Sequence, residues 1–352
     1  MMEHTTEEIR DFLIRQIPKH PEDVARIAAE KFRISRQAVN RHLRRLADEG
    51  VIIASGRTRR RRYSLATTST AKTFSLQDDL EEHRVWRNFV RPALGEVGAA
   101  AEDICHYGFT EMLNNAIEHS GGTSVRVNLG LSAAAVDLQV TDDGIGIFRK
   151  IRQELDLEDE LDSVLELAKG KLTTDPQRHT GEGIFFASRM FDEFVIRSGT
   201  LSYMHLPNGG ETDWLVEQTS QFHGTAVQMK IDPQTERRIE RVFDEFTSGE
   251  EGDYAFDVTH VPVALATHGD ENLVSRSQAR RLVRRFEGFR RVVLNFKGVE
   301  VIGQAFADEV FRVFQSEHPE VELLWANVNS QVERMIRRAR SRAAEDQQSG
   351  VN

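Results

Sequence analysis

This chain of 352 residues contains a single cysteine and lacks long apolar runs and an N-terminus of the signal-peptide type. Its only cysteine, Cys105, excludes an intrachain disulfide and a cysteine-rich zinc site, and the neighbouring Ile104 and Tyr107 predict a buried, unreactive thiol. No apolar run approaches the roughly 20 residues that span a bilayer, and the N-terminal stretch MMEHTTEEIR lacks the basic start and apolar core of a signal peptide. We therefore expect a cytosolic (cytoplasmic) protein that enters no membrane and performs no thiol redox chemistry.

Charge is distributed unevenly along the chain. The formal net charge is −10, yet residues 1–66 contain fifteen Lys or Arg against nine Asp or Glu. This basic surplus predicts a polyanionic partner for the N-terminal segment alone. The length allows two or three domains, each large enough to bury its own core.

The first 66 residues have the pattern of three helices followed by two short strands. Apolar spacing predicts helices over 5–17 and 21–32, and Ser35 can cap a third helix that stops at Gly50. The stretches VIIAS and RRYSLA predict two strands joined by the basic sequence GRTRR. This order resembles a winged helix-turn-helix, in which the third helix enters the major groove of DNA and the hairpin touches the flanking backbone.

The resemblance implies two sets of residues that bind duplex DNA. The side of the third helix that lies off its apolar stripe would read base edges, and the hairpin would contact phosphates. The residues on the helix are Arg36, Gln37, Asn40, Arg41 and Arg44. Those on the hairpin are Arg57, Arg59, Arg60, Arg61 and Arg62. Winged-helix modules also serve as docking or dimerisation units, so a protein partner is the alternative for residues 1–66.

The rest of the chain divides into a linker, a central segment and a C-terminal segment. The Thr- and Ser-rich stretch ATTSTAKT predicts a linker over 67–82, and mixed helix and strand patterns follow over 83–232. Within the central segment, residues 148–180 are polar and charged with little strand character, which predicts a mobile insert or lid. The remaining parts are an acidic connector at 233–253, a third domain at 254–342 and a polar tail at 343–352.

Four sequence blocks in the central segment indicate a ligand site. In the helical stretch FTEMLNNAIEHS, Glu111 and Asn115 lie one turn apart at the border of the apolar face. The other blocks are DDGIGI at 142–147, HTGEGIFFASRM at 179–190 and HGTAVQM at 223–229. A single Gly-x-Gly is weak evidence because turns supply many by chance. Four blocks in this order are strong evidence.

These blocks resemble those of the GHKL ATPase superfamily, which includes gyrase B, histidine kinases, MutL and the bacterial anti-sigma serine kinases. The resemblance covers residues 83–232. It implies a Bergerat-type α/β sandwich, a layer of helices on a mixed sheet, that binds ATP with Mg²⁺. The matching residues are Glu111, Asn115, Asp142, Gly144, Gly146, Gly181, Gly183, Gly224 and Thr225. The stripe that carries Glu111 and Asn115 would then face a magnesium triphosphate.

The chemistry of these residue types suits such a site. Asn115 can give an amide oxygen to Mg²⁺, a hard cation that prefers oxygen. Glu111 can take a proton from a water, or from a substrate hydroxyl, that attacks the γ-phosphate. Asp142 can accept a hydrogen bond from the adenine amino group. The glycines let the backbone approach the ligand and its phosphates.

The second half of the predicted lid contains two lysines, and the helix after it begins with bulky residues. Lys169 and Lys171 are candidate clamps for the triphosphate, with simple solvation as the alternative. Many family members carry a third glycine soon after the position of Gly183, whereas Ile-Phe-Phe occupies 184–186 here. We therefore expect a bulkier start of the following helix and a different path for the phosphates.

The C-terminal segment alternates strands and helices, which predicts a small sheet covered by helices. Its stretch LNFKGVEVIGQAFADEVFRVF resembles the STAS-like fold of anti-sigma-factor antagonists, in which one turn carries a phosphorylatable serine. Alignment on Ile302 places Gly303, Gln304 and Ala305 at that turn, where no hydroxyl is present. The segment is closer to a STAS-like branch of unknown function that occurs beside such ATPases. We expect it to dock a protein partner or a second copy of this chain, as in a homodimer.

The expected fold class is a multidomain α+β protein: a winged helix-turn-helix, a Bergerat-type ATPase domain and a small STAS-like α/β domain. The leading functional hypothesis is a DNA-binding regulator of transcription or signal transduction whose ATPase domain binds, and slowly hydrolyses, Mg-ATP. A serine/threonine protein kinase of the anti-sigma type and an ATP-dependent adaptor without hydrolysis are the alternatives. A histidine kinase is disfavoured, because His83 lies only 28 residues before Glu111 and leaves no room for a phosphoacceptor hairpin.

Overall fold

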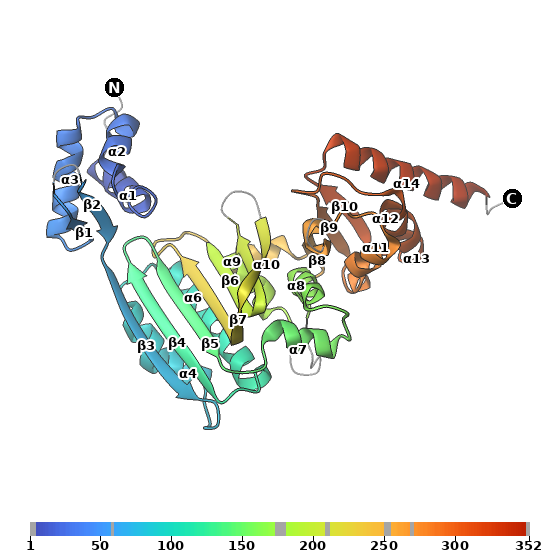
Figure 1. Ribbon diagram of the computed structural model, residues 1–352, viewed down its shortest axis with the longest axis horizontal. Helices are drawn as coiled ribbons and strands as arrows, with labels where there is room; N and C mark the ends of the chain where they lie inside the picture. Colours follow the sequence, from blue (N-terminus) through green and yellow to red (C-terminus); the bar gives the residue numbers. More distant parts are fainter. Residues whose placement is uncertain are drawn as a thin grey trace.

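The computed structural model describes residues 5–57, 60–172, 181–207, 212–249, 255–267 and 271–349. An N-terminal unit, a central unit with a five-stranded sheet and a C-terminal unit follow one another along the long axis of the molecule (Figure 1). Every helix among the described residues is too short or too polar to traverse a bilayer.

The N-terminal unit consists of three helices and a hairpin with a hydrophobic core of its own. Its elements are α1 (Thr6–Gln16), α2 (Val24–Phe32), α3 (Arg36–Asp48) and the antiparallel strands β1 (Ile52–Ser55) and β2 (Arg62–Leu65). Ser35 caps α3, since its hydroxyl accepts a hydrogen bond of 3.1 Å from the amide of Ala38. The elements occur in the predicted order, and their assignment to the winged helix-turn-helix class stays a prediction.

Residues Thr67–Ser75 form strand β3, so the linker predicted over 67–82 is wrong for its first half. β3 pairs antiparallel with β4 (Ser124–Ser132) along its whole length and is therefore an edge strand of the central sheet. The composition that suggested a linker is rich in β-branched threonine, which favours an extended backbone. Only Ala66 separates β2 from β3, so the N-terminal unit joins the central sheet almost without a spacer.

The central sheet has the strand order β3-β4-β5-β7-β6. Its remaining strands are β5 (Val136–Asp142), β6 (Glu193–Leu206) and β7 (Thr212–Ile231). Every neighbouring pair of strands among the described residues is antiparallel, so the mixed sheet that the resemblance implied is wrong. The reason is the position of β7, which lies between β5 and β6 and separates the two strands that run in the same direction.

Helices cover one face of the central sheet (Figure 1), and buried residues accordingly alternate with less buried ones along β5. The helices of this unit are α4 (Glu82–Val85), η2 (Trp86–Val90), α5 (Arg91–Leu94), α6 (Ala99–His119), α7 (Ile147–Glu154), α8 (Glu160–Lys169), α9 (Gly183–Met190) and α10 (Ile239–Glu245). The long helix α6 contributes Phe109, Met112 and Leu113 to the core. Phe246, which follows α10, is fully buried. The connector predicted over 233–253 is therefore partly built into the domain.

Residues 148–180, predicted as a mobile polar insert, contain most of α7 and all of α8. α8 is buried from Asp162 to Lys169, although its sequence is rich in charge. The mobile-lid interpretation is therefore wrong for α8, because its charged side chains find partners on a distant part of the chain. Residues 173–180 of the predicted lid lie outside the described residues.

The C-terminal unit is a parallel three-stranded sheet with helices, as the strand–helix alternation predicts. Its strands, in the order β10-β9-β8, are β8 (Val258–Pro262), β9 (Arg291–Asn295) and β10 (Glu322–Ala326). Its helices are η3 (Val263–Ala266), α11 (Arg276–Val283), η4 (Phe286–Gly288), α12 (Gln304–Asp308), η5 (Glu309–Phe314), α13 (Gln315–Glu317) and α14 (Ser330–Ser349). Buried side chains of this unit and of the central unit form one continuous hydrophobic cluster.

Candidate functional site

A cavity of about 310 Å³ lies between α6, the end of β5 and the helices α7, α8 and α9. All four sequence blocks contribute to its wall, although they are far apart in the chain. The predicted residues that line it are Glu111, Asn115, Asp142, Gly146, Gly181, Gly183 and Thr225. Apolar side chains such as Met112, Ile147 and Ile151 complete the wall. A mostly apolar cavity with a few convergent polar groups is the usual form of a small-molecule site.

Asp142 is the buried carboxylate of this cavity, with 8% of its surface exposed. It ends strand β5, and its Oδ1 accepts hydrogen bonds from the amides of Gly144 (2.9 Å) and Thr225 (3.2 Å). Burial raises the pKa of Asp142, and the two amide donors oppose that rise. The two bonds fix the carboxylate where the end of β5 pairs with Thr225, inside β7.

Gly144 and Gly224 do not line the cavity, although the sequence predicts that they approach the ligand. They line a separate hollow of about 320 Å³, together with Asp143. A β-carbon at Gly224 would lie 2.0 Å from the carbonyl oxygen of Asp142, so the close approach of the end of β5 to this part of β7 requires glycine there. The contribution of these two glycines is to hold Asp142 in place.

Glu111 and Asn115 lie one turn apart on α6 and both line the cavity, as their spacing predicts. α9 begins at Gly183, beside the carboxylate of Glu111. The helices α6 and α9 therefore bring the carboxylate of Glu111, the side-chain amide of Asn115 and the first backbone amides of α9 to the same end of the cavity. Oxygen donors and backbone amides in this arrangement suit a phosphate chain with its counter-ion.

Lys150 on α7 is a cation in the cavity wall that was not among the residues predicted from the sequence. Its Nζ donates a hydrogen bond of 2.9 Å to the carbonyl oxygen of His119 and lies 3.6 Å from Glu154 Oε1. A signal was available, because Lys150 and Glu154 fall at helical spacing from Ile147 just after the DDGIGI block.

Lys169 and Lys171 do not line the cavity, so the predicted clamp role is wrong. Lys169 Nζ is fully buried and donates hydrogen bonds to Glu166 Oε1 (2.7 Å) and to the carbonyl oxygens of Arg281 and Arg284 (3.0 Å each).

Leu167 and Leu172 line the cavity in place of the two lysines. Two positions along a helix are about 200° apart around its axis, so Leu167 and Lys169 point to opposite sides. The ammonium group of Lys171 also turns to the C-terminal unit, where it donates a hydrogen bond of 2.8 Å to the carbonyl oxygen of Gly288.

A second, larger groove of about 930 Å³ reaches Glu111 from the other side of α6. Its wall is made by the start of α4, the N-terminal half of α6 and residues Arg237–Glu240. Thr110 Oγ1 is buried there without a hydrogen-bond partner in the described part of the chain. Glu111 is the one residue that lines both the groove and the cavity, among the residues that the structure describes.

The predicted DNA-contacting residues of α3 all lie on its exposed side: Arg36, Gln37, Asn40, Arg41 and Arg44. On the hairpin, Arg57, Arg60, Arg61 and Arg62 are exposed, and Arg62 Nε lies 3.3 Å from Glu22 Oε1. Arg59 lies outside the described residues. The N-terminal unit therefore presents a basic surface on its third helix and its hairpin.

Family models match two parts of the chain. Residues 76–204 match the model described as a histidine kinase-like ATPase domain. The central unit carries this ATPase domain. Residues 278–333 match the model described as a STAS-like domain of unknown function. No curated protein matches the chain.

These matches confirm the two domain types predicted from the central and C-terminal motifs, and they leave residues 1–66 unassigned. An ATPase domain of this type implies ATP binding. The match includes Glu111, Asn115 and Asp142 but ends before Thr225, whose amide donates to Asp142. The site therefore extends beyond the matched segment into β7.

Proposed function

We propose that this protein is a regulator that binds Mg-ATP in the cavity beside Glu111 and hydrolyses it slowly. The observation that carries the proposal is the convergence of all four sequence blocks on one cavity in the unit that matches the ATPase domain. The cavity volume of about 310 Å³ is at the lower end of the range for small-molecule sites, roughly 300–1,000 Å³.

The polar residues of the cavity divide between the two ends of the nucleotide. Asp142 accepts a hydrogen bond from the adenine amino group, and Ile147 and Ile151 cover the ring. Asn115 gives its amide oxygen to Mg²⁺, which when bound neutralises part of the triphosphate charge. The described residues hold no cluster of three or more His, Cys, Asp or Glu that could bind a metal, so Asn115 would share the coordination of Mg²⁺ with the nucleotide and water.

Glu111 is the proposed general base. Its carboxylate takes a proton from a water molecule as the water oxygen bonds to the γ-phosphorus. The bond from that phosphorus to the β,γ-bridging oxygen breaks, and ADP leaves with the electron pair. The groove of about 930 Å³ that also reaches Glu111 lets water approach without displacing the nucleotide.

The same groove supports a second candidate function, a serine/threonine protein kinase. A groove of about 930 Å³ can admit a side chain from a partner protein, whose hydroxyl would replace water as the attacking group. Glu111 would serve as the base in both reactions.

Incubation of the full chain with γ-labelled ATP separates the candidates. We expect released phosphate from the wild type, and from Glu111→Gln normal binding with turnover about 100- to 10,000-fold slower. Label on the chain or on an added partner would favour the kinase. Unchanged ATP with the wild-type protein would contradict both and leave an adaptor that only binds nucleotide.

We also propose that residues 1–66 bind duplex DNA and that the C-terminal unit docks a protein partner or a second copy of the chain. The exposed basic surface of α3 and the hairpin supports the first part. The STAS-like match supports a docking role for the second. ATP binding would then regulate a DNA-bound protein through its C-terminal unit.

A further inference from the structure

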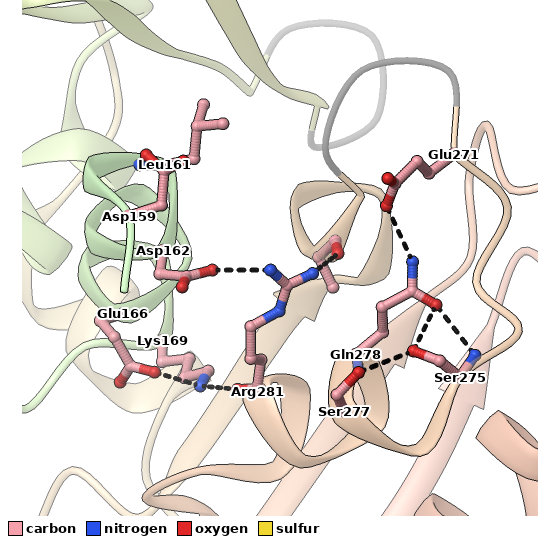
Figure 2. Close-up of polar contacts among 11 residues, drawn as sticks. Asp159, Leu161, Asp162, Glu166, Lys169, Glu271, Ser275, Ser277, Gln278 and Arg281 are labelled. Carbon is pink, nitrogen blue, oxygen red and sulfur yellow. Dashed lines mark hydrogen bonds and ion pairs between the residues drawn. The ribbon is translucent and has the colours of Figure 1, made fainter. Parts of the chain in front are cut away.

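Helix α8 has one side in the nucleotide cavity and the other against the C-terminal unit. Leu167 lines the cavity, and Leu172 follows shortly after the helix. Asp162, Glu166 and Lys169 point the other way, toward α11 (Figure 2). Lys169 Nζ also lies 5.5 Å from the ring centroid of Phe286 in η4. A displacement of α8 would therefore alter both surfaces together.

Arg285 of the C-terminal unit binds the C-terminal end of α8. Its Nη1 donates to Glu166 Oε2 at 3.1 Å, and its Nη2 donates to the carbonyl oxygens of Gly170, at 3.0 Å, and Lys171. One planar guanidinium thus meets three acceptors on a single stretch of chain, which a point charge cannot do equally well. Leu172 is the next residue after Lys171, so the contact is adjacent to the cavity wall.

The ion pairs around Arg285 are buried and therefore depend on precise geometry. Glu166 is 2% exposed and Lys169 is fully buried. Glu166 accepts from both Lys169 and Arg285. Removal of Glu166 would leave two cations without a carboxylate partner, and removal of Arg285 would leave Glu166 with Lys169 alone, so the arrangement of all three groups depends on each of them.

Arg281 holds the same helix one turn earlier. Its Nη1 lies 3.4 Å from Asp162 Oδ1, and its Nη2 donates a hydrogen bond of 3.1 Å to the carbonyl oxygen of Ala266 (Figure 2). Arg285 itself has a φ of 67°, a left-handed conformation that is uncommon for residues with a side chain. The backbone of the C-terminal unit therefore adopts an uncommon conformation at Arg285, the residue whose side chain contacts α8.

Aromatic rings connect the other end of the cavity to the same unit. Phe185, two residues after Gly183, lines the cavity, and its ring centroid lies 4.6 Å from that of Phe256. A β-carbon at Gly170 would lie 2.7 Å from Phe256 and 2.9 Å from Phe185, so the end of α8 packs into this contact. The residues at 184–186 that replace a family glycine are thus part of the contact between the two units.

We propose that Arg285 is a positioning residue for the nucleotide site: it fixes the end of α8 and so places Leu167 and Leu172 against bound ATP. This inference rests on the proposed function, because it concerns the same cavity. Through Arg285 the C-terminal unit sets the affinity for ATP, and by reciprocity ATP tightens the contact between α8 and the C-terminal unit. A ligand of the C-terminal unit that shifts Arg285 changes ATP affinity by the same route.

Calorimetry of Mg-ATP binding to the full chain tests the inference with matched arginine variants. Arg285→Ala weakens binding by about 5- to 150-fold, the usual range of coupling between sites. The ATP affinity of Arg285→Lys lies between those of the wild type and Arg285→Ala, because an ammonium group cannot donate to all three acceptors. Arg284→Ala is the control, since that side chain is exposed. Equal affinity of Arg285→Ala and the wild type overturns the inference alone, whereas a wild type that binds no ATP overturns the proposed function.

Kinetics and hydrogen exchange distinguish positioning from loss of folding. A positioning role raises KM for ATP in Arg285→Ala and leaves kcat nearly unchanged. A partly unfolded variant would lower the apparent kcat in proportion and keep KM. In the wild type, Mg-ATP slows amide exchange in α11 and η4, which lie outside the cavity. Unchanged exchange there would contradict the inference without any variant.

Discussion

The carboxylate of Glu111 lies directly against the backbone of Gly183, so that a β-carbon at residue 183 would be 1.9 Å from Glu111 Oε2. The proposed base on α6 is therefore in contact with the first residue of α9. Because a carboxylate is the far end of a flexible side chain, a methyl group at residue 183 would push Glu111 aside before it moved either helix.

Gly183→Ala should lower turnover while the protein stays folded. The displaced carboxylate is out of line with the attacking water, and small misplacement of a reacting group reduces rates by about 100-fold. Steady-state hydrolysis and thermal unfolding of the full chain check this. Gly288→Ala is the matched control, since no atom lies within 4 Å of the β-carbon it would add. Equal turnover of Gly183→Ala and the wild type would show that Glu111 has another position during the reaction.

Asp142→Asn should weaken ATP binding by about 1.5–3 kcal/mol, roughly 10- to 150-fold. The asparagine oxygen can keep the bonds from Gly144 and Thr225, but its amide nitrogen then meets the adenine amino group, and two donors face each other. Calorimetry with the full chain measures the difference. Similar affinities of the two proteins would exclude Asp142 as the adenine acceptor.

ATP affinity should also fall as the solution becomes acidic. The fall should begin at a higher pH than it would if Asp142 had the pKa of an ordinary aspartate. Burial raises the pKa of Asp142 above the usual value of about 3.9, so protonation removes the acceptor earlier as the pH falls. The ratio of wild-type to Asp142→Asn affinity cancels the titration of the nucleotide itself. That ratio should decrease toward one as the pH is lowered. A ratio that does not change with pH would contradict the role of the carboxylate.

The cavity was predictable because each of its blocks combines a local pattern with a side chain of definite chemistry. Glu111 and Asn115 follow from helical spacing, and Asp142 follows from its place at the end of a strand before glycines. Sequence patterns also predict the strand and helix order of the C-terminal unit. β3 was missed because a solvent-exposed edge strand of threonines has the composition of a linker.

The role of α8 could not be predicted, because it depends on pairing between residues more than 100 positions apart. The carbonyl oxygens that accept from Lys169 belong to Arg281 and Arg284, and no local pattern connects them. A charged helix in sequence usually means a solvated one. Here tertiary contacts bury most of the charged side chains of α8. Lys169 and Lys171, which were predicted to clamp the phosphates, instead contact the C-terminal unit.

The buried position of Lys169 makes stability depend on pH. Burial lowers the pKa of Lys169 to about 8, against roughly 10.4 in an unfolded chain. Between these values the unfolded state binds more protons, so the free energy of unfolding rises with pH through this window, by up to about 3 kcal/mol. Lys169→Met should flatten this rise, measured as thermal unfolding temperature from pH 7.5 to 10. Lys31→Met, at an exposed position, is the control and should leave it unchanged.

The basic surface of the N-terminal unit should bind duplex DNA with an affinity that falls steeply as salt rises. Alanine at Arg59, Arg60, Arg61 and Arg62 leaves up to four DNA phosphates without a positive partner. The slope of log affinity against log salt should then shrink by about 0.9 for each phosphate that is no longer neutralised.

The variant Asn40→Ala with Arg41→Ala should instead reduce discrimination between DNA sequences, because base edges carry the sequence information and phosphates do not. Arg26→Ala is a control in the same unit, since Arg26 belongs to α2 and its Nη2 lies 2.6 Å from Asp23 Oδ2. Titration of the full chain at several salt concentrations, with specific and random duplexes, separates the two effects. A protein that ignores DNA at low salt but self-associates through this unit would be a signalling adaptor, because the exposed arginines of α3 would then serve a protein interface.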